Sequence, residues 1–588
     1  MLKNSYTALR KTHISLALVG LMWVLPFLHY RHEYPLTTFD QEWWAVLFGV
    51  LAMATLAGKD YWKSAQLPGV VLLPVTLIVV AVLQITVGKI IYAEQGMLYI
   101  LYLLFAAQMM LLGAGLRRDL GMDTVTLFLA IALLFGAEVS AAIGVLQHFA
   151  VHSWFDSVIV RKIGPGLYGN IAQPNHYANY ISLGIASLGL LYQKRKLGMT
   201  SVILLALPLL FVMTLSGSRT SWLYLIAMLV LAAWMRYKDR SLSPLLSYSI
   251  AIIVGYLMMH WLVQIAPHAG NVVDTTSLRT SDTSGYIRLQ LWQESVQMFM
   301  RFPLLGAGFG QFAYQHLTLQ PLFPASHVTG LYNNAHNVVL QLAAETGLAG
   351  LLPLLVIMGG WAYGLRDAKR SASHWWCYAL IAVITIHGLL EYPLWYVYFL
   401  SIIAFLLGLA DETSFKLDMP RVGRVAMTAV ILTGAVVLAH LKYSYLQVKT
   451  ALIMPVGAGA ESAQLYWKNL VAIRDKSWLM LPLVDMYIGN TMSVDERNLK
   501  QKLVFNTNTL HYIPSAEAVY RQAYMLAEAG ELAEAKVVLT QALYSYPNNP
   551  NARNLLMRLA ENDPAHFSAL LEFAVQQEQE IARAVRIK

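Results

Sequence analysis

The sequence predicts an all-α protein that crosses a membrane many times. Of its 588 residues, 57% are hydrophobic and 13% are charged, which is about half the charged fraction of a soluble protein. The mean hydropathy is +0.51. Apolar runs long enough to cross a bilayer recur from the N-terminus to about residue 440. These observations exclude a disordered chain, a coiled coil and a small disulfide scaffold.

Apolar runs of about 17–25 residues between charged segments predict about 13 membrane spans. The first run has a basic leader with Lys3, Arg10 and Lys11, but no small-residue cleavage site follows it. We therefore expect an uncleaved span there rather than a signal peptide. The expected spans lie near 13–30, 41–57, 68–87, 96–116, 124–149, 176–192, 199–215, 220–235, 245–265, 338–364, 374–390, 393–410 and 423–441.

The connecting segments alternate in positive charge. Segments on the side of the N-terminus hold 19 Lys and Arg residues, and those on the other side hold 8 through residue 441. Because cytoplasmic loops carry the excess of positive charge, we expect the N-terminus in the cytoplasm. An odd number of spans then places the C-terminal region outside. If one weak span is miscounted, the C-terminal region is predicted on the opposite side of the membrane, but the long loop at 266–337 remains external.

Two stretches have the composition of water-exposed regions. Residues 266–337 are rich in Thr, Ser, Gly and Pro and are expected to form a long external loop with a helix near 286–301; loops of this length are usually functional. Residues 442–588 hold 15 basic and 14 acidic residues and are expected to form a helical C-terminal domain. Within it, residues 516–550 have the spacing of one tetratricopeptide repeat. Residues 1–441 are then the transmembrane domain.

Polar clusters open the sixth and eighth expected spans at their external ends, where ionisable groups are costly and suggest function. Gln173 and Asn175 flank Pro174, a residue suited to a helix start; an ordinary helix cap explains them about equally well. Arg219 lies in the short link 216–221, so its guanidinium must lie at the membrane edge. A guanidinium beside a helix N-terminus and several serines suits an anion, and a snorkelling anchor is the alternative.

Two further clusters belong to the external loop. Arg288 precedes the glycine-rich run 302–310, which permits close backbone approach but lacks the Lys-Ser/Thr of a phosphate-binding loop. Arg288 could equally pair with Glu294 or face water. His336, followed by Asn337, lies where the loop enters the tenth span. A lone histidine is more often structural, but a neutral imidazole there can accept a proton.

A tight turn with Glu391 and Tyr392 joins the eleventh and twelfth spans. No carboxylate cluster at the external face indicates a divalent metal, and no nucleotide-binding, haem or hydrolase motif occurs. The single cysteine, Cys377, cannot form an internal disulfide. We therefore expect no metal and no other cofactor.

Five motifs in order resemble the O-antigen ligase superfamily. His336-Asn337, nine further residues and then Gly347-x-x-Gly350 fit the superfamily pattern H-[NSQ]-x9-G-x-x-[GTY]. Arg288 with the downstream run PLLGAGFGQF is similar to the external-loop signature of the superfamily.

The remaining motifs narrow the resemblance. Ser-Arg219-Thr is similar to the second arginine site of the superfamily. The QPNH motif at 173–176, the EYP turn at 391–393 and the C-terminal repeat together resemble the bacterial protein O-oligosaccharyltransferases (the PglL type).

The resemblance implies a GT-C-like enzyme at the periplasmic face of the bacterial inner membrane. Such an enzyme transfers a glycan from undecaprenyl diphosphate to a Ser or Thr hydroxyl of an exported protein, often a pilin, with inversion and without a metal. In this reading His336 activates the acceptor hydroxyl, while Arg219 and Arg288 bind the diphosphate. The residues expected to position donor or acceptor are Gln173, Asn175, Asn337, Glu391 and Tyr392.

Three other functions remain open at this point. An O-antigen ligase would transfer the same donor to lipid A-core, and an O-antigen polymerase would transfer it to another glycan. The QPNH motif and the C-terminal domain favour a protein acceptor. A transporter of a lipid-linked anion is less favoured, because transporters usually show internal repeats and broken helices at the midplane. The basic residues follow membrane topology, so no nucleic acid partner is expected.

Overall fold

The computed structural model describes residues 2–58, 61–63, 65–151, 154–164, 166–265, 284–324, 328–367, 369–453 and 460–586. The chain divides into two compact units. The first comprises Met1–Val75, Tyr102–Asp282 and Leu354–Ala439, and the second comprises Thr76–Leu101, Thr283–Pro353 and His440–Lys588. One division lies close to the expected domain boundary at 441. The second unit also contains two segments from the region expected to be transmembrane.

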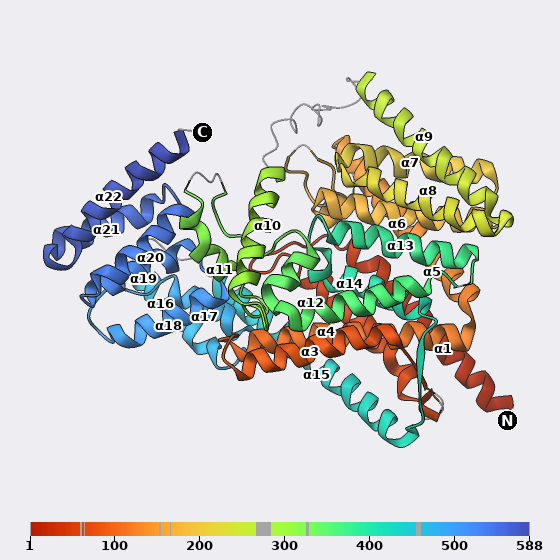
Figure 1. Cartoon of the computed structure of the whole chain (residues 1–588), viewed down its shortest axis with the longest axis horizontal. Helices are drawn as coiled ribbons and strands as arrows, with labels where there is room; N and C mark the ends of the chain where they lie inside the picture. Colours follow the sequence, from red (N-terminus) through yellow and green to blue (C-terminus); the bar gives the residue numbers. More distant parts are fainter. Residues whose placement is uncertain are drawn as a thin grey trace. The chain divides into compact units, whose positions relative to one another are not determined.

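Most elements of the first unit are helices, coloured by chain order in Figure 1. Its α-helices are α1 (Leu2–Leu28), α2 (Phe39–Ala52), α5 (Met122–His148), α6 (Pro174–Gln193), α7 (Met199–Ser216), α8 (Thr220–Lys238), α9 (Ser243–Ile265), α13 (Ala372–Gly388) and α14 (Val397–Ala410). Its 3-10 helices are η1 (Met53–Ala57), η2 (Tyr61–Lys63), η3 (Gly69–Val71), η4 (Asp156–Val158), η5 (Gly169–Ile171), η6 (Arg240–Leu242) and η8 (Pro393–Trp395).

The described part of the second unit is also helical. It contains α10 (Ser284–Arg301), α11 (Phe312–Leu319), η7 (Gln320–Leu322), α16 (Ala460–Arg474), η9 (Trp478–Met480), α17 (Leu481–Gly489), α18 (Leu499–Tyr512), α19 (Ala516–Glu528), α20 (Leu532–Ser545), α21 (Pro550–Asn562) and α22 (Pro564–Arg586). Four helices contain residues of both units, namely α3 (Leu72–Thr86), α4 (Ala93–Leu120), α12 (Val338–Gly364) and α15 (Pro420–Ile453).

Two short strands depart from the expected all-helical class. Strands β1 (Ala65–Pro68) and β2 (Ser414–Leu417) pair antiparallel in the first unit, with Ala65 opposite Leu417. Residue Gly69, directly after β1, donates its N–H to the carbonyl oxygen of Thr413 at 3.2 Å. This ribbon links the start of α3 to the segment after α14.

Helix α6 forms the centre of the first unit. It packs against α5, α7, α8, α9 and α13, and Figure 1 shows it beside α7 and α8. Every residue from His176 to Leu191 is buried. Because neighbouring helices surround α6, it can carry polar residues such as Asn179 and Ser187, whose side chains bond to main-chain carbonyls of the unit.

Nine helices in the described residues are long and apolar enough to cross a membrane. They coincide with nine of the expected spans, and a polytopic membrane protein is therefore confirmed in class. The other four expected spans are 41–57, 176–192, 374–390 and 393–410. They correspond to α2, α6, α13 and α14, which are either short or, in the case of α6, rich in polar residues. The count of 13 stays a prediction.

Glycines allow α4 and α14 to approach closely within the first unit. A Cβ atom at Gly408 would lie 1.9 Å from the carbonyl oxygen of Met110, and one at Gly113 would lie 2.2 Å from the carbonyl oxygen of Phe405. Small residues at helix contacts are typical of membrane proteins, where packing replaces the hydrophobic effect as the cause of association.

The external loop and the C-terminal helices share a hydrophobic core in the second unit. Leu317 of α11 is buried in the same cluster as Tyr524 and Phe567, and α11 packs against α18 and α20. In addition, the N–H of Gly330 donates to the carbonyl oxygen of Ser545 at 2.6 Å. The helix expected near 286–301 is confirmed as α10, whereas residues 266–283 and 325–327 of the expected loop lie outside the described residues.

The expected repeat at 516–550 contains two packed helices, α19 and α20. Gly530 separates them with a φ of +80°, a left-handed conformation that favours glycine. A helix–turn–helix pair is thus present at the expected place. Its assignment to the tetratricopeptide family stays a prediction.

Candidate active site

In the first unit, the QPNH motif forms the start of α6. Gln173 is the residue before the helix, with an extended backbone, and its side-chain oxygen accepts a hydrogen bond from the N–H of His176. Pro174 occupies the first turn, where its missing N–H costs nothing. The helix cap, one of the two readings left open for this motif, is therefore present. It uses the oxygen of Gln173, so the amide group still has N–H donors to offer.

Asn175 joins three of the predicted motifs. Its amide nitrogen donates to a carboxylate oxygen of Glu391 at 2.8 Å, and its amide oxygen accepts from the hydroxyl of Ser218 at 2.8 Å. The Ser218 hydroxyl also lies 2.7 Å from that of Thr220. Glu391 is 4% exposed. These four residues, which we call the Asn175 cluster, hold the start of α6, the start of α8 and the turn after α13 together.

Arg219 lies at the edge of the Asn175 cluster. It precedes the first residue of α8, and Gly217 turns the chain there with a φ of +64°. The neighbouring residues Ser218 and Thr220 are buried, while the side chain of Arg219 is exposed. A guanidinium at a helix N-terminus, next to backbone N–H groups, is suited to an anionic ligand.

Tyr392 lies in the turn directly after Glu391 and belongs to an aromatic group. Its ring stacks on Tyr396 with 5.9 Å between centroids, and the ring of His176 lies 6.4 Å away. Burial raises the pKa of Tyr392 above its ordinary value. The phenol therefore remains protonated at neutral pH and can donate a hydrogen bond.

In the second unit, Asn337 and His336 form the entrance to α12. The side-chain oxygen of Asn337 accepts from the N–H groups of Val339 and Leu340, both at 3.1 Å, so Asn337 caps the helix. His336 has a φ of +52°, a left-handed conformation that is uncommon outside glycine. Its N–H donates to the side-chain oxygen of Asn334 at 2.9 Å.

Helix α10 carries Arg288, whose side chain is half-buried. One turn further along, the indole N–H of Trp292 donates to the carbonyl oxygen of Ala335 at 3.0 Å. This bond connects the helix that carries Arg288 to the residue before His336. The alternative pairing of Arg288 with Glu294 is less favoured, because the carboxylate of Glu294 bonds to His316 and Gln290.

The first glycine of the superfamily pattern, Gly347, has a structural role in the second unit. Gly347 interrupts α12 with a φ of 58° and a ψ of −153°. The break allows Gly306 to pack on the helix backbone, since a Cβ atom at Gly306 would lie 2.2 Å from the carbonyl carbon of Glu345. The N–H of Gly308 donates to the carbonyl oxygen of Glu345 at 3.0 Å. The run after Arg288 is thus a structural loop rather than a phosphate cradle.

Two buried side chains hold this loop in place. One oxygen of the Glu345 carboxylate accepts from the N–H of Gly310 at 3.0 Å. Gln84 donates to the carbonyl oxygens of Leu305 and Glu345 at 2.6 and 2.7 Å, and its oxygen accepts from the N–H of Phe309 at 3.0 Å. Glu345, which lies two turns after His336 in sequence, therefore serves the glycine loop.

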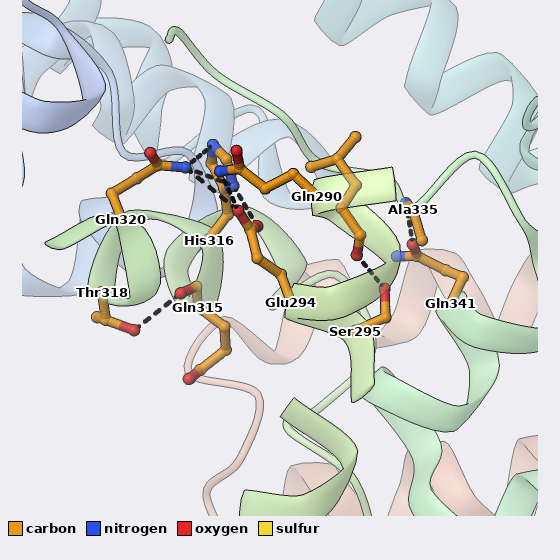
Figure 2. Close-up of polar contacts among 10 residues, drawn as sticks. Gln290, Glu294, Ser295, Gln315, His316, Thr318, Gln320, Ala335 and Gln341 are labelled. Atoms are coloured by element: carbon orange, nitrogen blue, oxygen red, sulfur yellow. Dashed lines mark hydrogen bonds and ion pairs between the residues drawn. The ribbon is translucent and has the colours of Figure 1, made fainter. Parts of the chain in front are cut away.

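A buried histidine–carboxylate pair in the second unit was not predicted from the sequence. Nδ1 of His316 lies 2.6 Å from a carboxylate oxygen of Glu294, and the two side chains are 2% and 0% exposed. Figure 2 shows Gln290 and Gln320 completing the group. The pair fastens α10 to α11. Buried polar side chains 22 residues apart leave no local pattern that would have revealed it.

Removing this pair is expected to destabilise the second unit. Glu294→Ala leaves the imidazole of His316 buried without its carboxylate partner, which costs about 1–3 kcal/mol. The check is the thermal unfolding midpoint of the full-length protein in detergent, compared with Glu496→Ala, whose side chain is exposed in the same unit. Equal midpoints for both variants would contradict the structural role of the pair.

The predicted site residues fall into two groups. Gln173, Asn175, Arg219, Glu391 and Tyr392 belong to the first unit. Arg288, His336 and Asn337 belong to the second. Within the first unit the structure brings Asn175 and Glu391 into contact, and within the second it connects the helix of Arg288 to the residue before His336.

In the described residues no group of three or more His, Cys, Asp or Glu side chains forms a candidate metal site. Transfer without a metal stays a prediction.

Three family descriptions match successive parts of the chain. Residues 167–192 match protein glycosylation ligase, and residues 202–355 match O-antigen ligase. Residues 375–560 match the C-terminal part of a virulence factor membrane-bound polymerase. Together the matches cover more than half of the chain and include all eight predicted site residues. The chain is therefore similar to the O-antigen ligase superfamily, most directly over residues 202–355.

Two curated relatives from Acinetobacter baylyi define the enzyme class more closely. The chain is 29% identical to a general O-oligosaccharyltransferase over 409 residues, which are 67% of this chain and 69% of the relative. It is 24% identical to a ComP-specific O-oligosaccharyltransferase over 385 residues, or 65% and 68% of the two chains. The protein is an oligosaccharyltransferase.

Proposed function

We propose that the protein transfers an oligosaccharide as one block from undecaprenyl diphosphate to Ser or Thr hydroxyls of exported proteins, such as a pilin. The observation that carries the proposal is the match to O-antigen ligase at residues 202–355, the segment that holds Arg219, Arg288 and His336. The relatives named as O-oligosaccharyltransferases favour a protein acceptor over lipid A-core.

The proposed site faces the periplasm of a bacterial inner membrane, with the N-terminus in the cytoplasm. The charge of the connecting segments supports this orientation, because basic residues gather on the side of the N-terminus. All eight proposed site residues lie in segments expected on the opposite side or at the span ends beside them. The C-terminal domain is proposed to lie on the same side.

In the proposed reaction, the acceptor hydroxyl attacks the anomeric carbon from the face opposite the diphosphate. The bond between this carbon and the diphosphate oxygen breaks, and the electron pair leaves with the lipid diphosphate. His336 takes up the hydroxyl proton as general base; its alternative role is to orient the hydroxyl through a hydrogen bond. Because the diphosphate is already a good leaving group, no carboxylic acid is required to protonate it, and the configuration at the anomeric carbon inverts.

The two arginines are proposed to bind the diphosphate. A guanidinium offers a planar fork of N–H donors that matches phosphate oxygens. Arg219 is exposed at the N-terminus of α8, and Arg288 is half-buried on α10. Charge that develops on the departing diphosphate would be stabilised by donors already in place. We propose that no metal is needed for this step.

The remaining residues are proposed to position donor or acceptor. The amide group of Gln173 has N–H donors to offer, and the protonated phenol of Tyr392 can donate as well. Asn175 and Glu391 support them through their mutual hydrogen bond at 2.8 Å. Asn337 caps α12 and so orients the backbone directly after His336.

Loss of one arginine is expected to slow transfer strongly. Arg288→Ala or Arg219→Ala should each cost about 2–4 kcal/mol of transition-state stabilisation, measured as kcat/KM for the lipid-linked donor. Arg301→Ala is the matched control, because Arg301 lies on the same helix as Arg288 and its guanidinium rests on the ring of Phe302. Equal rates for Arg288→Ala and Arg301→Ala would remove Arg288 from the proposed site.

The proposed function is tested by reconstitution. The purified protein in liposomes receives an oligosaccharide on undecaprenyl diphosphate and a pilin, with EDTA present, and intact-mass analysis reports glycan addition. A glycan-sized mass increase is expected. Transfer to lipid A-core alone would indicate an O-antigen ligase, and movement of the donor between leaflets without transfer would indicate a transporter. Activity restored only by a divalent cation would overturn the metal-free reaction.

A further inference from the structure

The backbone of His336 is held in an unusual conformation. Its φ of +52° lies in the left-handed region, which side chains with a Cβ atom rarely adopt, and such conformations persist only where the surroundings impose them. The angle φ describes rotation about the bond that follows the peptide group between Ala335 and His336. Whatever fixes this peptide group therefore contributes to the direction of the imidazole.

Both ends of this peptide group are bound. Its N–H, from His336, donates to the side chain of Asn334 at 2.9 Å. Its carbonyl oxygen, from Ala335, accepts from the indole N–H of Trp292 at 3.0 Å. The donor on the carbonyl side comes from α10, a helix more than forty residues earlier in the chain. Trp292 is therefore the long-range contact that orients the peptide plane before His336.

The neighbouring peptide groups are bound as well. The N–H of Ala335 donates to the side-chain oxygen of Gln341 at 2.6 Å, as Figure 2 shows. The N–H of Gln341 in turn donates to the carbonyl oxygen of Asn337 at 2.8 Å. Ala335 is fully buried. These bonds fix the backbone on both sides of His336.

Trp292 also relates His336 to Arg288. Trp292 and Arg288 are four positions apart on α10, so they lie on the same face of the helix, one turn from each other. The helix is itself fastened by the buried Glu294–His316 pair. A shift of the Trp292 contact would therefore change the separation between His336, the proposed base, and Arg288, which is proposed to bind the diphosphate.

We propose that Trp292 is a positioning residue for glycan transfer: its indole N–H holds the carbonyl of Ala335 and thereby sets the direction of His336 relative to Arg288. This inference rests on the proposed function, in which His336 receives the acceptor proton. Trp292 acts through His336 and has no contact with the reacting atoms. Since small misplacements of reacting groups slow catalysis severely, loss of this one hydrogen bond has a kinetic consequence.

The first test compares Trp292→Phe with the wild-type protein in the reconstituted transfer assay. Phenylalanine keeps an aromatic ring at this position and removes the donor. We expect kcat to fall at least about tenfold, with the KM for the lipid-linked donor unchanged within about twofold. Gln341→Met, which removes the other side-chain partner of Ala335, should give the same pattern. Trp467→Phe, at an exposed tryptophan of the same unit, should leave both constants unchanged.

The second test places Trp292→Phe in the His336→Ala background. A residue that acts only through His336 adds no further loss there, because effects within one catalytic unit are not additive. An equal further loss in this background would overturn the proposal, as would a wild-type kcat for Trp292→Phe. If His336→Ala itself retains normal transfer, it is the proposed role of His336 that fails. Thermal midpoints measured on each variant distinguish these outcomes from misfolding.

Discussion

Replacement of His336 by alanine is expected to reduce glycan transfer by about 10²–10⁴-fold while the protein remains folded. The factor is that of a general base in the transition state. His336 is half-buried, and its backbone is held by Asn334 and, through Ala335, by Trp292. These bonds involve only main-chain atoms of His336, so alanine can keep them. Intact-mass analysis of the pilin acceptor after timed incubation measures the rate.

The control for this prediction is His566→Ala. His566 is a surface histidine of α22 that pairs with Asp563 at 2.6 Å, with its side chain 40% exposed. The His566→Ala variant is expected to transfer glycan at the wild-type rate. Donor binding by His336→Ala should be close to normal, because the arginines that bind the diphosphate are intact. Near-normal transfer by this variant would show that another group takes the proton.

Substitution of Gly347 by alanine is expected to prevent accumulation of folded protein. The φ of 58° and ψ of −153° at Gly347 fall in a region that is nearly restricted to glycine. A Cβ atom there would also lie 2.6 Å from both the amide nitrogen of Gly306 and the carbonyl oxygen of Leu304. These are backbone atoms and cannot rotate away. The N–H of Leu348 bonds to the carbonyl oxygen of Pro303 across the same break, so the glycine loop would separate from α12.

Gly359→Ala is the matched control on the same helix. Nothing lies within 4 Å of a Cβ atom at Gly359, and alanine favours a helix over glycine by about 0.5–1 kcal/mol. We expect wild-type yield for Gly359→Ala and loss of the monodisperse peak for Gly347→Ala in size-exclusion chromatography. Recovery of Gly347→Ala with the wild-type thermal midpoint would mean that the break in α12 is not required.

Local composition was sufficient to predict most of the helices. The spans expected at 124–149 and 199–215 are α5 and α7, with ends that differ by two residues or fewer. The expected loop helix is α10. Such segments follow from a long apolar run or from helical spacing within one stretch of chain. The span expected at 41–57 differs, because α2 ends at Ala52 and continues as a 3-10 helix.

Helix α6 illustrates what hydropathy alone cannot evaluate. It is 20 residues long and buried over nearly its whole length, yet it is not among the nine strongly apolar helices. Helix α13 supplies partners for its polar residues. The amide nitrogen of Asn179 donates to the carbonyl oxygen of Val383 at 3.3 Å, and the hydroxyl of Ser187 accepts from the indole N–H of Trp376 at 3.0 Å. A helix in contact with lipid has to be apolar, whereas a helix enclosed by other helices does not.

The residues of the candidate site could likewise be predicted from the sequence, whereas their contacts could not. The sequence indicated Asn175, Arg219, Arg288, His336 and Glu391, because polar residues at the ends of apolar runs are unusual and local. It did not indicate their partners. Ser218 was visible only as part of a serine-rich link, and the pair of Glu294 and His316 followed no motif.

By itself, the sequence determined that this protein is a helical membrane protein and which polar residues lie at the ends of its helices, because both depend on neighbouring residues. Only the tertiary structure decided that Asn175 bonds to Glu391, 216 residues away, and that Trp292 holds the peptide before His336. A hydrogen-bond partner is set by how helices pack against each other, and the packing depends on the shapes of whole helix faces.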